Sequence, residues 1–256
     1  MTELPGGTMF YFAFNHDRPA FKGSGQIPLA KAINWAIDRP ALVRAFGYLG
    51  GERTDQILPP AMGRDATLYP LGGVSERSLA KARSLLAKAA FKPRSLVLYS
   101  PQGPFRLWAQ IFQFNLKRLG IDVEIKYFPT FGAMFAQAST RVEPFDVVMA
   151  PWSPDYADGF AYFGLLLDGD TLQQTGNFNL AYFNRPKYNT AIHRIEGMSG
   201  EARRKAWADL DVEMMRDDPP WASVMVPANV DFVSKSVGCY VFQPAIGFDL
   251  GAACKK

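Results

Sequence analysis

Apolar residues recur along the chain in two patterns, one typical of strands and the other typical of helices. The clearest unit joins an apolar run at residues 95–99 to an amphipathic segment at 104–119 and a second apolar run at 121–127. The middle segment has the helical period, and Gly120 follows it as a helix cap. Two strands joined by such a helix form a right-handed crossover with parallel strands. The pattern therefore predicts an α/β fold.

A third parallel strand is predicted at residues 146–151, where an apolar run rich in valine ends in proline. Parallel strands end at the same edge of a sheet, so the loops at 100–105 and 152–158 are expected to line one rim. The second loop carries an aromatic ring, a phenol and two carboxylates, namely Trp152, Tyr156, Asp155 and Asp158. Ligands collect at this edge of such sheets, and the sequence therefore predicts a ligand cleft here.

The rest of the chain follows the same two periods. Asp38 and Pro40 divide one amphipathic stretch into two short helices or one kinked helix. Helices are predicted at residues 28–37, 40–46, 79–89 (capped by Ser75 or Ser78) and 200–217 (capped by Ser199), and strands at 9–14, 222–226 and 230–233. Residues 50–70 are expected to form a long loop over a surface. Beyond Pro227 no helical period remains, so the tail is expected to rest on another domain.

Composition places the chain among ordinary globular proteins. It has 256 residues, 48% hydrophobic and 20% charged, which suits one large domain or one domain with an appendage. The net charge of +4 is mild and no block of five like charges occurs, so nucleic acid is not expected as a partner. No apolar run of 18 residues is present, and the amino end lacks the basic flank and long apolar core of a signal peptide.

The cysteines and histidines are few. Cys239 and Cys254 lie 15 residues apart, which is neither a disulfide framework nor a metal spacing, so one bridge and two free thiols both remain open. His193 has no acidic or cysteine partner at ligand spacing, and the other histidine is His16, so no metal site is expected. No phosphate-binding glycine loop or nucleophile motif occurs, and no cofactor is expected.

Six segments of the chain, in order, match those of one protein family. They are AINWAIDRPALVRAFGYLGG with ILPP; SLAKARSLLAKAAF; LVLYS with AQIFQFNLKRLGIDVEI; FDVVMAPWSPDYAD; AYFNRPKYNTAI; and the helix that ends in DDPPW. Together they cover nearly the whole chain. On these segments the chain resembles extracellular solute-binding protein family 5, the peptide, oligopeptide and nickel receptors of bacterial ABC importers.

The resemblance implies a fold and a division of the chain. Members have two lobes and about twice this length, so the chain is expected to be the second lobe of a longer protein. The expected fold is α/β, a class II periplasmic-binding-protein-like lobe with a mixed, mainly parallel sheet flanked by helices. Residues 1–26 would form a crossing strand or hinge segment, 27–226 the second lobe, and 227–256 a tail that returns to the first lobe.

The implied function is transport. A member of this family is the substrate-binding component of an ABC importer and delivers its ligand to a permease in the membrane. The ligand expected here is a peptide or a similar small polar solute, held between the two lobes. The resemblance further implies a periplasmic, or extracellular and membrane-associated, location and a monomer.

The resemblance also assigns ligand-binding residues. Asp155 matches the acidic residue that accepts the ligand's α-ammonium group, and a carboxylate in a closed cleft makes a charge-assisted bond about twice as strong as a neutral one. The alternative is that Asp155 caps a turn or the helix that begins near Gly159. Trp152 would either form the pocket floor or pack in the core. Tyr156 is assigned to the site with them.

Two arginines and a second acid complete the candidates. Arg141 lies near the position where some members carry a basic residue for the ligand's carboxylate, which suits a bidentate guanidinium. A solvated loop arginine is the alternative, and Arg106 on the same expected rim is a weaker candidate. Asp158 is expected to cap a helix at residues 160–167. The family usually has proline where this chain has Gly159, which is expected to loosen the loop.

Two other hypotheses remain open. The same domain can follow a DNA-binding module and act as the ligand-sensing part of a transcriptional regulator. An enzyme could use the loop with Asp155 and Asp158, but carboxylates three residues apart carry no indication of the separation that glycosidase chemistry requires. No catalytic constellation is present in the sequence, so the chain is not expected to be an enzyme.

Overall fold

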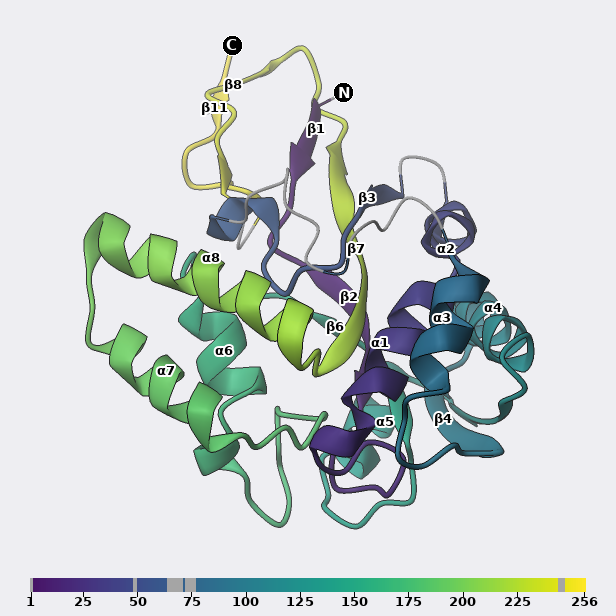
Figure 1. Cartoon of the computed structure of the whole chain (residues 1–256). Helices are drawn as coiled ribbons and strands as arrows, with labels where there is room; N and C mark the ends of the chain where they lie inside the picture. The colour runs from purple at the N-terminus through teal and green to yellow at the C-terminus, as the bar shows by residue number, and fades with distance from the viewer. Residues whose placement is uncertain (1, 48–49, 64–70, 72–76, 244–246) are drawn as a thin grey trace.

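A computed structural model describes residues 2–47, 50–63, 71, 77–243 and 247–256 (Figure 1). Its centre is a seven-stranded sheet in the order β1-β7-β2-β6-β4-β5, with β3 also paired to β7. The strands of this sheet are β1 (Thr2–Pro5), β2 (Met9–Phe14), β3 (Gly51–Arg53), β4 (Ser95–Pro101), β5 (Asp122–Phe128), β6 (Val147–Trp152) and β7 (Trp221–Asp231). The described residues hold no helix that combines the length and the apolar character needed to cross a bilayer.

The sheet has a parallel half and an antiparallel half. β4 pairs with β5 and β6 in parallel, whereas β2 pairs with β6 and β7 in antiparallel fashion, and β1 and β3 do the same with β7. The mixed sheet is confirmed, but the expectation of mainly parallel strands holds only for β4, β5 and β6. The predicted crossover from β4 to β5 and the third parallel strand are both present.

Helices cover both faces of the sheet, as Figure 1 shows. The helices are α1 (Ile27–Ala36), α2 (Arg39–Phe46), α3 (Leu79–Leu86), α4 (Arg106–Lys117), α5 (Phe131–Ala138), α6 (Phe160–Leu166), α7 (Pro186–Glu196) and α8 (Gly200–Asp217). Successive residues of a strand point to opposite faces of the sheet, so alternate side chains of β2 pack into two different cores. Tyr11 belongs to the core under α6, α7 and α8, whereas Phe10 and Phe12 belong to the core under α1, α2 and α4.

Local signals placed most of these helices. Asp38 accepts a hydrogen bond from the Ala41 backbone N–H at 3.0 Å, so α1 and α2 are two helices divided at the predicted break. Ser78 caps α3 through the Lys81 N–H, and the alternative cap, Ser75, lies outside the described residues. Residues 64–70 of the loop predicted at 50–70 also lie outside them, and its described part includes the short strand β3. Ser199 occupies the cap position of α8, but its side chain accepts no capping bond.

One prediction about the strands was wrong. The two short strands expected at 222–226 and 230–233 are a single long strand, β7. Its first half pairs with β2 up to Met225 and its second half pairs with β1 from Ala228 onward. Pro227 therefore falls where β7 changes partner between β2 and β1, and the strand continues through it.

The tail beyond β7 consists of short paired segments. β8 (Val237–Gly238) pairs with β11 (Cys254–Lys255), and β9 (Phe242–Gln243) pairs with β10 (Gly247–Phe248). Cys239 and Cys254 form a disulfide, which resolves the alternative left open by the sequence. Phe232 and Leu250 in this tail are 83% and 77% exposed, so it presents apolar side chains to its surroundings.

Candidate functional site

The predicted rim forms at one edge of the sheet. Leu98 lies opposite Val147 in the parallel pair of β4 and β6, so both strands leave the sheet at the same edge. Met9 lies opposite Trp152 in the neighbouring pair, and the Thr8 and Ser153 hydroxyls are 2.8 Å apart. The segment between β1 and β2 therefore runs beside the loop that follows β6. We call residues 152–158 the rim loop.

Trp152 begins the rim loop and is half-buried. Its Nε1 donates a hydrogen bond to the Ala161 carbonyl oxygen at 2.8 Å. Its ring packs edge-on against Phe178, with centroids 5.6 Å apart, and Phe178 is 56% exposed. The indole is therefore held by α6 and by Phe178 while it stays half-buried.

Asp155 and Tyr156 are exposed in the rim loop. Within the described part of the chain, the Asp155 carboxylate has no hydrogen-bond or ion-pair partner, and the capping role considered for it has no matching contact. Burial, followed by the charge of Asp158, raises the pKa of the Tyr156 phenol above its ordinary value. The loop thus presents a phenol that stays neutral at neutral pH, beside the unpaired side chain of Asp155.

Asp158 closes the rim loop by binding to α6 and α8. Its carboxylate accepts hydrogen bonds from the Phe160 N–H at 2.8 Å, from Arg203 Nε and Nη2 at 2.8 Å each, and from Trp207 Nε1 at 3.2 Å. Burial favours the neutral acid, but the hydrogen bonds from Arg203 and Phe160 outweigh it and hold the pKa of Asp158 below its ordinary value. The cap position of α6 is Gly159 and not Asp158 as predicted, but Asp158, one residue earlier, still binds the first N–H of the helix and links it to α8.

Gly159 packs closely against Trp207 of α8, and the looser loop expected from the missing proline stays a prediction. A Cβ atom at this position would lie 2.5 Å from Cγ of Trp207 and 2.8 Å from its Cβ. The backbone at Gly159 has φ −60° and ψ −23°, which any residue adopts, so the requirement for glycine is steric.

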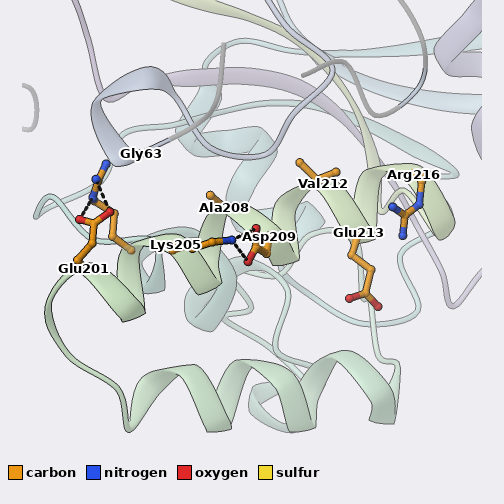
Figure 2. Close-up of a pocket in the computed structure, with 9 residues that line it drawn as sticks. Gly63, Glu201, Lys205, Ala208, Asp209, Val212, Glu213 and Arg216 are labelled. Atoms are coloured by element: carbon orange, nitrogen blue, oxygen red, sulfur yellow. Dashed lines mark hydrogen bonds and ion pairs between the residues drawn. The ribbon is translucent and has the colours of Figure 1, made fainter. Parts of the chain in front are cut away.

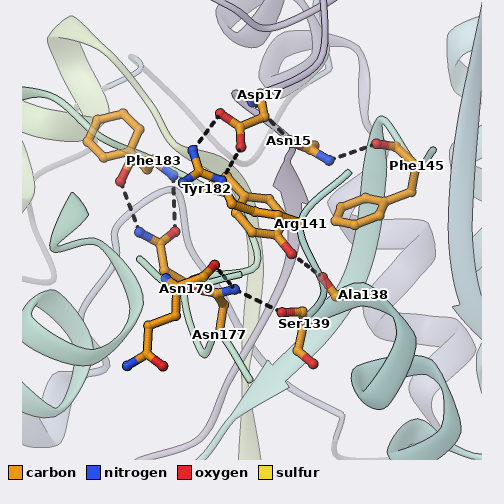
Figure 3. Close-up of polar contacts among 11 residues, drawn as sticks. Asn15, Asp17, Ala138, Ser139, Arg141, Phe145, Asn177, Asn179, Tyr182 and Phe183 are labelled. Carbon is orange, nitrogen blue, oxygen red and sulfur yellow. Dashed lines mark hydrogen bonds and ion pairs between the residues drawn. The ribbon is translucent and has the colours of Figure 1, made fainter. Parts of the chain in front are cut away.

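Arg141 lies at the opposite edge of the sheet from the rim loop. It precedes β6, and its guanidinium pairs with Asp17 through distances of 2.8 and 3.3 Å (Figure 3). Asp17 follows the end of β2, and Phe14 pairs with Val147 at the start of β6. The geometry thus brings Trp152, Asp155 and Tyr156 together and separates Arg141 from them. The hydrogen bond to Asp17 raises the pKa of Arg141 above its ordinary value.

The sequence of the chain matches a known family over most of its length. The profile described as "Bacterial extracellular solute-binding proteins, family 5 Middle" covers residues 2–174, which include the rim loop and all of the parallel half of the sheet. The chain belongs to this family.

Relatives and solved structures agree with the family assignment. The chain is 22% identical to "Probable D,D-dipeptide-binding periplasmic protein DdpA" of Escherichia coli, over 96% of this chain and 46% of that protein. It is also 22% identical to "Heme-binding protein A" of Haemophilus influenzae, over 97% and 44%. The structure of "Clavulanic acid biosynthesis oligopeptide binding protein 2" superposes with a TM-score of 0.86 at 23% identity, over 99% and 47%. The chain spans about half the length of these proteins, which are named as binding proteins.

We expect the link between Asp158 and α8 to stabilise this family member measurably. Arg203→Ala should lower the free energy of unfolding by about 1–2 kcal/mol, because it leaves a partly buried carboxylate without its bidentate partner. Arg204→Ala is the matched control, since Arg204 is 59% exposed and its ion pair among the described residues is with Glu201 on its own helix. Its effect should stay within about 0.5 kcal/mol. Urea unfolding of both variants measures the difference.

The same variants test the pH dependence. The folded-state pKa of Asp158 is depressed, so its stabilisation is present above the ordinary carboxyl pKa and is lost as the pH falls through the folded value. The deficit of Arg203→Ala should therefore shrink as the pH is lowered below about 4. A deficit that stays constant down to pH 2.5 would show that the charge of Asp158 has no part in it.

A pocket lies away from the rim loop, along the outer face of α8 (Figure 2). It has a volume of about 520 Å³. Its charged side chains are already paired: Arg204 with Glu201, Lys205 with Asp209, Glu213 with Lys187 and Arg216 with Asp217. These pairings leave no free charge among them to anchor an ionic ligand, unlike the carboxylate of Asp155.

The histidines are not placed as the sequence indicated. His193 was expected to lack an acidic partner, but its Nε2 lies 2.8 Å from Oδ2 of Asp168, so that expectation was wrong. The partner comes from a turn 25 residues earlier, which spacing along one helix does not reveal. His16 is buried, and its Nδ1 lies 3.1 Å from Arg185 Nη2. Burial, followed by the charge of Arg185, lowers the pKa of His16 to about 3.

Proposed function

We propose that the parent protein is the periplasmic substrate-binding component of an ABC importer. In this proposal it holds a peptide, or a similar small polar solute with a free ammonium group, between this lobe and a first lobe. It then delivers the ligand to a permease in the membrane. The single observation that carries the proposal is the carboxylate of Asp155, which is exposed on the rim loop and has no partner among the described residues.

The position of the rim loop supports a site between lobes. β1 and the second half of β7 extend from the sheet at the edge where β6 ends, and Gly7, between β1 and β2, accepts a hydrogen bond from the Tyr162 hydroxyl. Segments that continue toward a further lobe would thus leave beside Asp155. A ligand bound to both lobes stabilises the closed arrangement by its differential affinity for it.

The proposed roles follow from the contacts. Asp155 would accept the ligand's ammonium group, and exclusion of water by a second lobe would strengthen that charge-assisted bond. Trp152 would supply an apolar surface, since its indole is already fixed by Ala161. Tyr156 would offer a neutral hydroxyl beside the carboxylate. We leave Arg141 out of this site, because its guanidinium is at the other edge and bound to Asp17.

The test measures peptide binding to the full-length parent protein by calorimetry. We expect Asp155→Asn to weaken binding of di- to oligopeptides at least about tenfold, since one charge-assisted hydrogen bond is lost. N-acetylation of the peptide removes its ammonium group and should weaken binding to the wild type by a similar factor. Acetylation should make little further difference to the variant, because both changes remove the same interaction.

A matched control and a competing ligand complete the test. Asp209→Asn removes an exposed carboxylate that pairs with Lys205 on α8, and it should leave affinity unchanged. Equal affinity of wild type and Asp155→Asn for free peptides would overturn the assignment of Asp155. Because one relative is named as a heme-binding protein, heme belongs in the ligand panel. Binding of heme alone, unaffected by Asp155→Asn, would replace the peptide proposal.

A further inference from the structure

Two carboxylates and one imidazole meet beside α6 and α7, outside the rim loop. Asp168 and Asp170 flank the start of a short 3-10 turn at Gly169–Thr171, which follows α6. His193 lies in the last turn of α7. One potential ligand atom from each of these three side chains lies within 4.8 Å of the others. The set therefore combines oxygen and nitrogen donors from two separate segments.

Hydrogen bonds hold both carboxylates from behind. Asp168 Oδ1 accepts the Asp170 N–H at 3.0 Å, and Asp170 Oδ1 accepts a bond from Asn189 Nδ2 at 2.9 Å. Asn189 in turn accepts the Gly169 N–H at 3.1 Å. The remaining oxygen of each carboxylate is the one nearest to the imidazole. Supporting contacts of this kind fix the orientation of metal ligands.

The distances suit a shared ion. His193 Nε2 lies 2.8 Å from Asp168 Oδ2 and 3.9 Å from Asp170 Oδ2. Two ligands of a zinc ion, each about 2.1 Å from it, are separated by about 3.0 Å at a right angle and about 3.4 Å at a tetrahedral angle. The two observed separations bracket that range. The two carboxylate oxygens lie within 4.8 Å of each other, so side-chain rotations would bring all three atoms to bonding distance of one ion.

The accessibility of the three side chains also fits an ion that enters from solvent. The Asp168 side chain is 8% exposed, whereas those of His193 and Asp170 are 48% and 60% exposed. The buried carboxylate provides a fixed base, and water can complete the coordination on the open side. Imidazole with two carboxylates favours zinc and similar transition-metal ions over calcium or magnesium, which prefer sets of oxygen ligands.

We propose that Asp168, Asp170 and His193 bind a divalent transition-metal ion of the zinc type. The ion would join the turn after α6 to the last turn of α7, and it would displace the proton shared by His193 and Asp168. Its expected role is structural, because the three side chains tie together two segments of one layer. The proposal is independent of the peptide site, since neither Asp155 nor Trp152 takes part.

The chain is well suited to a test of this site. It has two histidines, of which His16 is buried, and both cysteines are in a disulfide. Zinc added to the tag-free protein should therefore perturb the ring NMR signals of His193 and leave those of His16 in place. We expect zinc to raise the melting temperature of the wild type, and magnesium at the same concentration to leave it unchanged.

Variants decide whether these residues are the ligands. His193→Gln and Asp170→Asn should each weaken zinc binding at least tenfold by calorimetry, whereas Asp209→Asn on α8 should bind as the wild type does. Asp170→Asn replaces an exposed carboxylate, and its melting temperature without metal verifies that it folds. Zinc binding that is unchanged in both variants, or no change of the His193 ring signals at millimolar zinc, would overturn the proposal.

Discussion

Replacing Arg39 by methionine is expected to lower the free energy of unfolding by about 3–5 kcal/mol, which is the usual cost of removing one partner from a buried ionic network. The Arg39 guanidinium is buried and bonds to Asn34 through two contacts of 2.8 Å. Its Nε donates to the carbonyl oxygens of Ser223 at 2.7 Å and Thr54 at 3.1 Å. The single side chain thus links α2 to α1, to β7 and to the segment after β3.

The charge of Arg39 is part of the expected loss. Burial lowers the pKa of Arg39 to about 10, while the carboxylate of Asp55 opposes that change, so the side chain remains charged at neutral pH. Methionine fills a similar volume but offers no donor, which leaves buried carbonyl oxygens unsatisfied. Chemical denaturation of wild type and variant at pH 7 measures the difference.

Arg44 offers a matched control on the same helix. It is exposed, and Arg44→Met should change the free energy of unfolding by less than about 0.5 kcal/mol. Equal stability of the two methionine variants would show that the network around Arg39 contributes nothing beyond its apolar stem. A folded Arg39→Met protein with wild-type stability would lead to the same conclusion.

Gly159→Ala should destabilise the chain by about 3 kcal/mol, near the upper end of typical overpacking costs. Trp207 is 1% exposed and stacks on Phe163 with ring centroids 5.2 Å apart, so its indole has no space into which to move away from a new methyl group. A shift of Trp207 would also strain its 3.2 Å bond to Asp158 and disturb the rim loop. Thermal and urea unfolding measure the loss.

The same substitution at Gly132, Gly132→Ala, should stabilise the chain instead of destabilising it. Gly132 lies exposed in the first turn of α5, and a Cβ there would have its nearest neighbour, Thr130 Oγ1, at 3.8 Å. Alanine in a helix is more stable than glycine by about 0.5–1 kcal/mol because it restricts the unfolded chain. Destabilisation of similar size at both positions would refute the steric explanation for Gly159.

Elements fixed by local signals could be predicted from the sequence. The crossover from β4 to β5 follows from two apolar runs and a helical period that ends at Gly120. The break at Asp38 follows from a cap and a proline within three residues. The rim loop was placed correctly because it follows a strand with buried residues on both faces. In each case residues close in sequence determine the outcome.

Features that depend on distant partners could not be predicted. Pro227 suggested the end of a strand, yet β7 continues because its partner changes there from β2 to β1. Gly159 looked permissive until the position of Trp207, 48 residues later, was known. The place of Arg141 at the other edge follows from its position before β6, but its ion pair with Asp17, 124 residues away, could not be foreseen. Spacing and composition contain no information about such contacts.

The register of β1 and β7 determines how the lobe would respond to mechanical force. Thr2 lies opposite Asp231 and Pro5 opposite Ala228, so the two outer ends of this ladder emerge together. Tension that pulls Thr2 and Asp231 apart would open the hydrogen bonds one pair after another, as in a zipper, instead of shearing them all at once. The ladder of β1 and β7 would therefore open at low force. Until that ladder had opened, the pairing of β2 with β6 would carry none of the load.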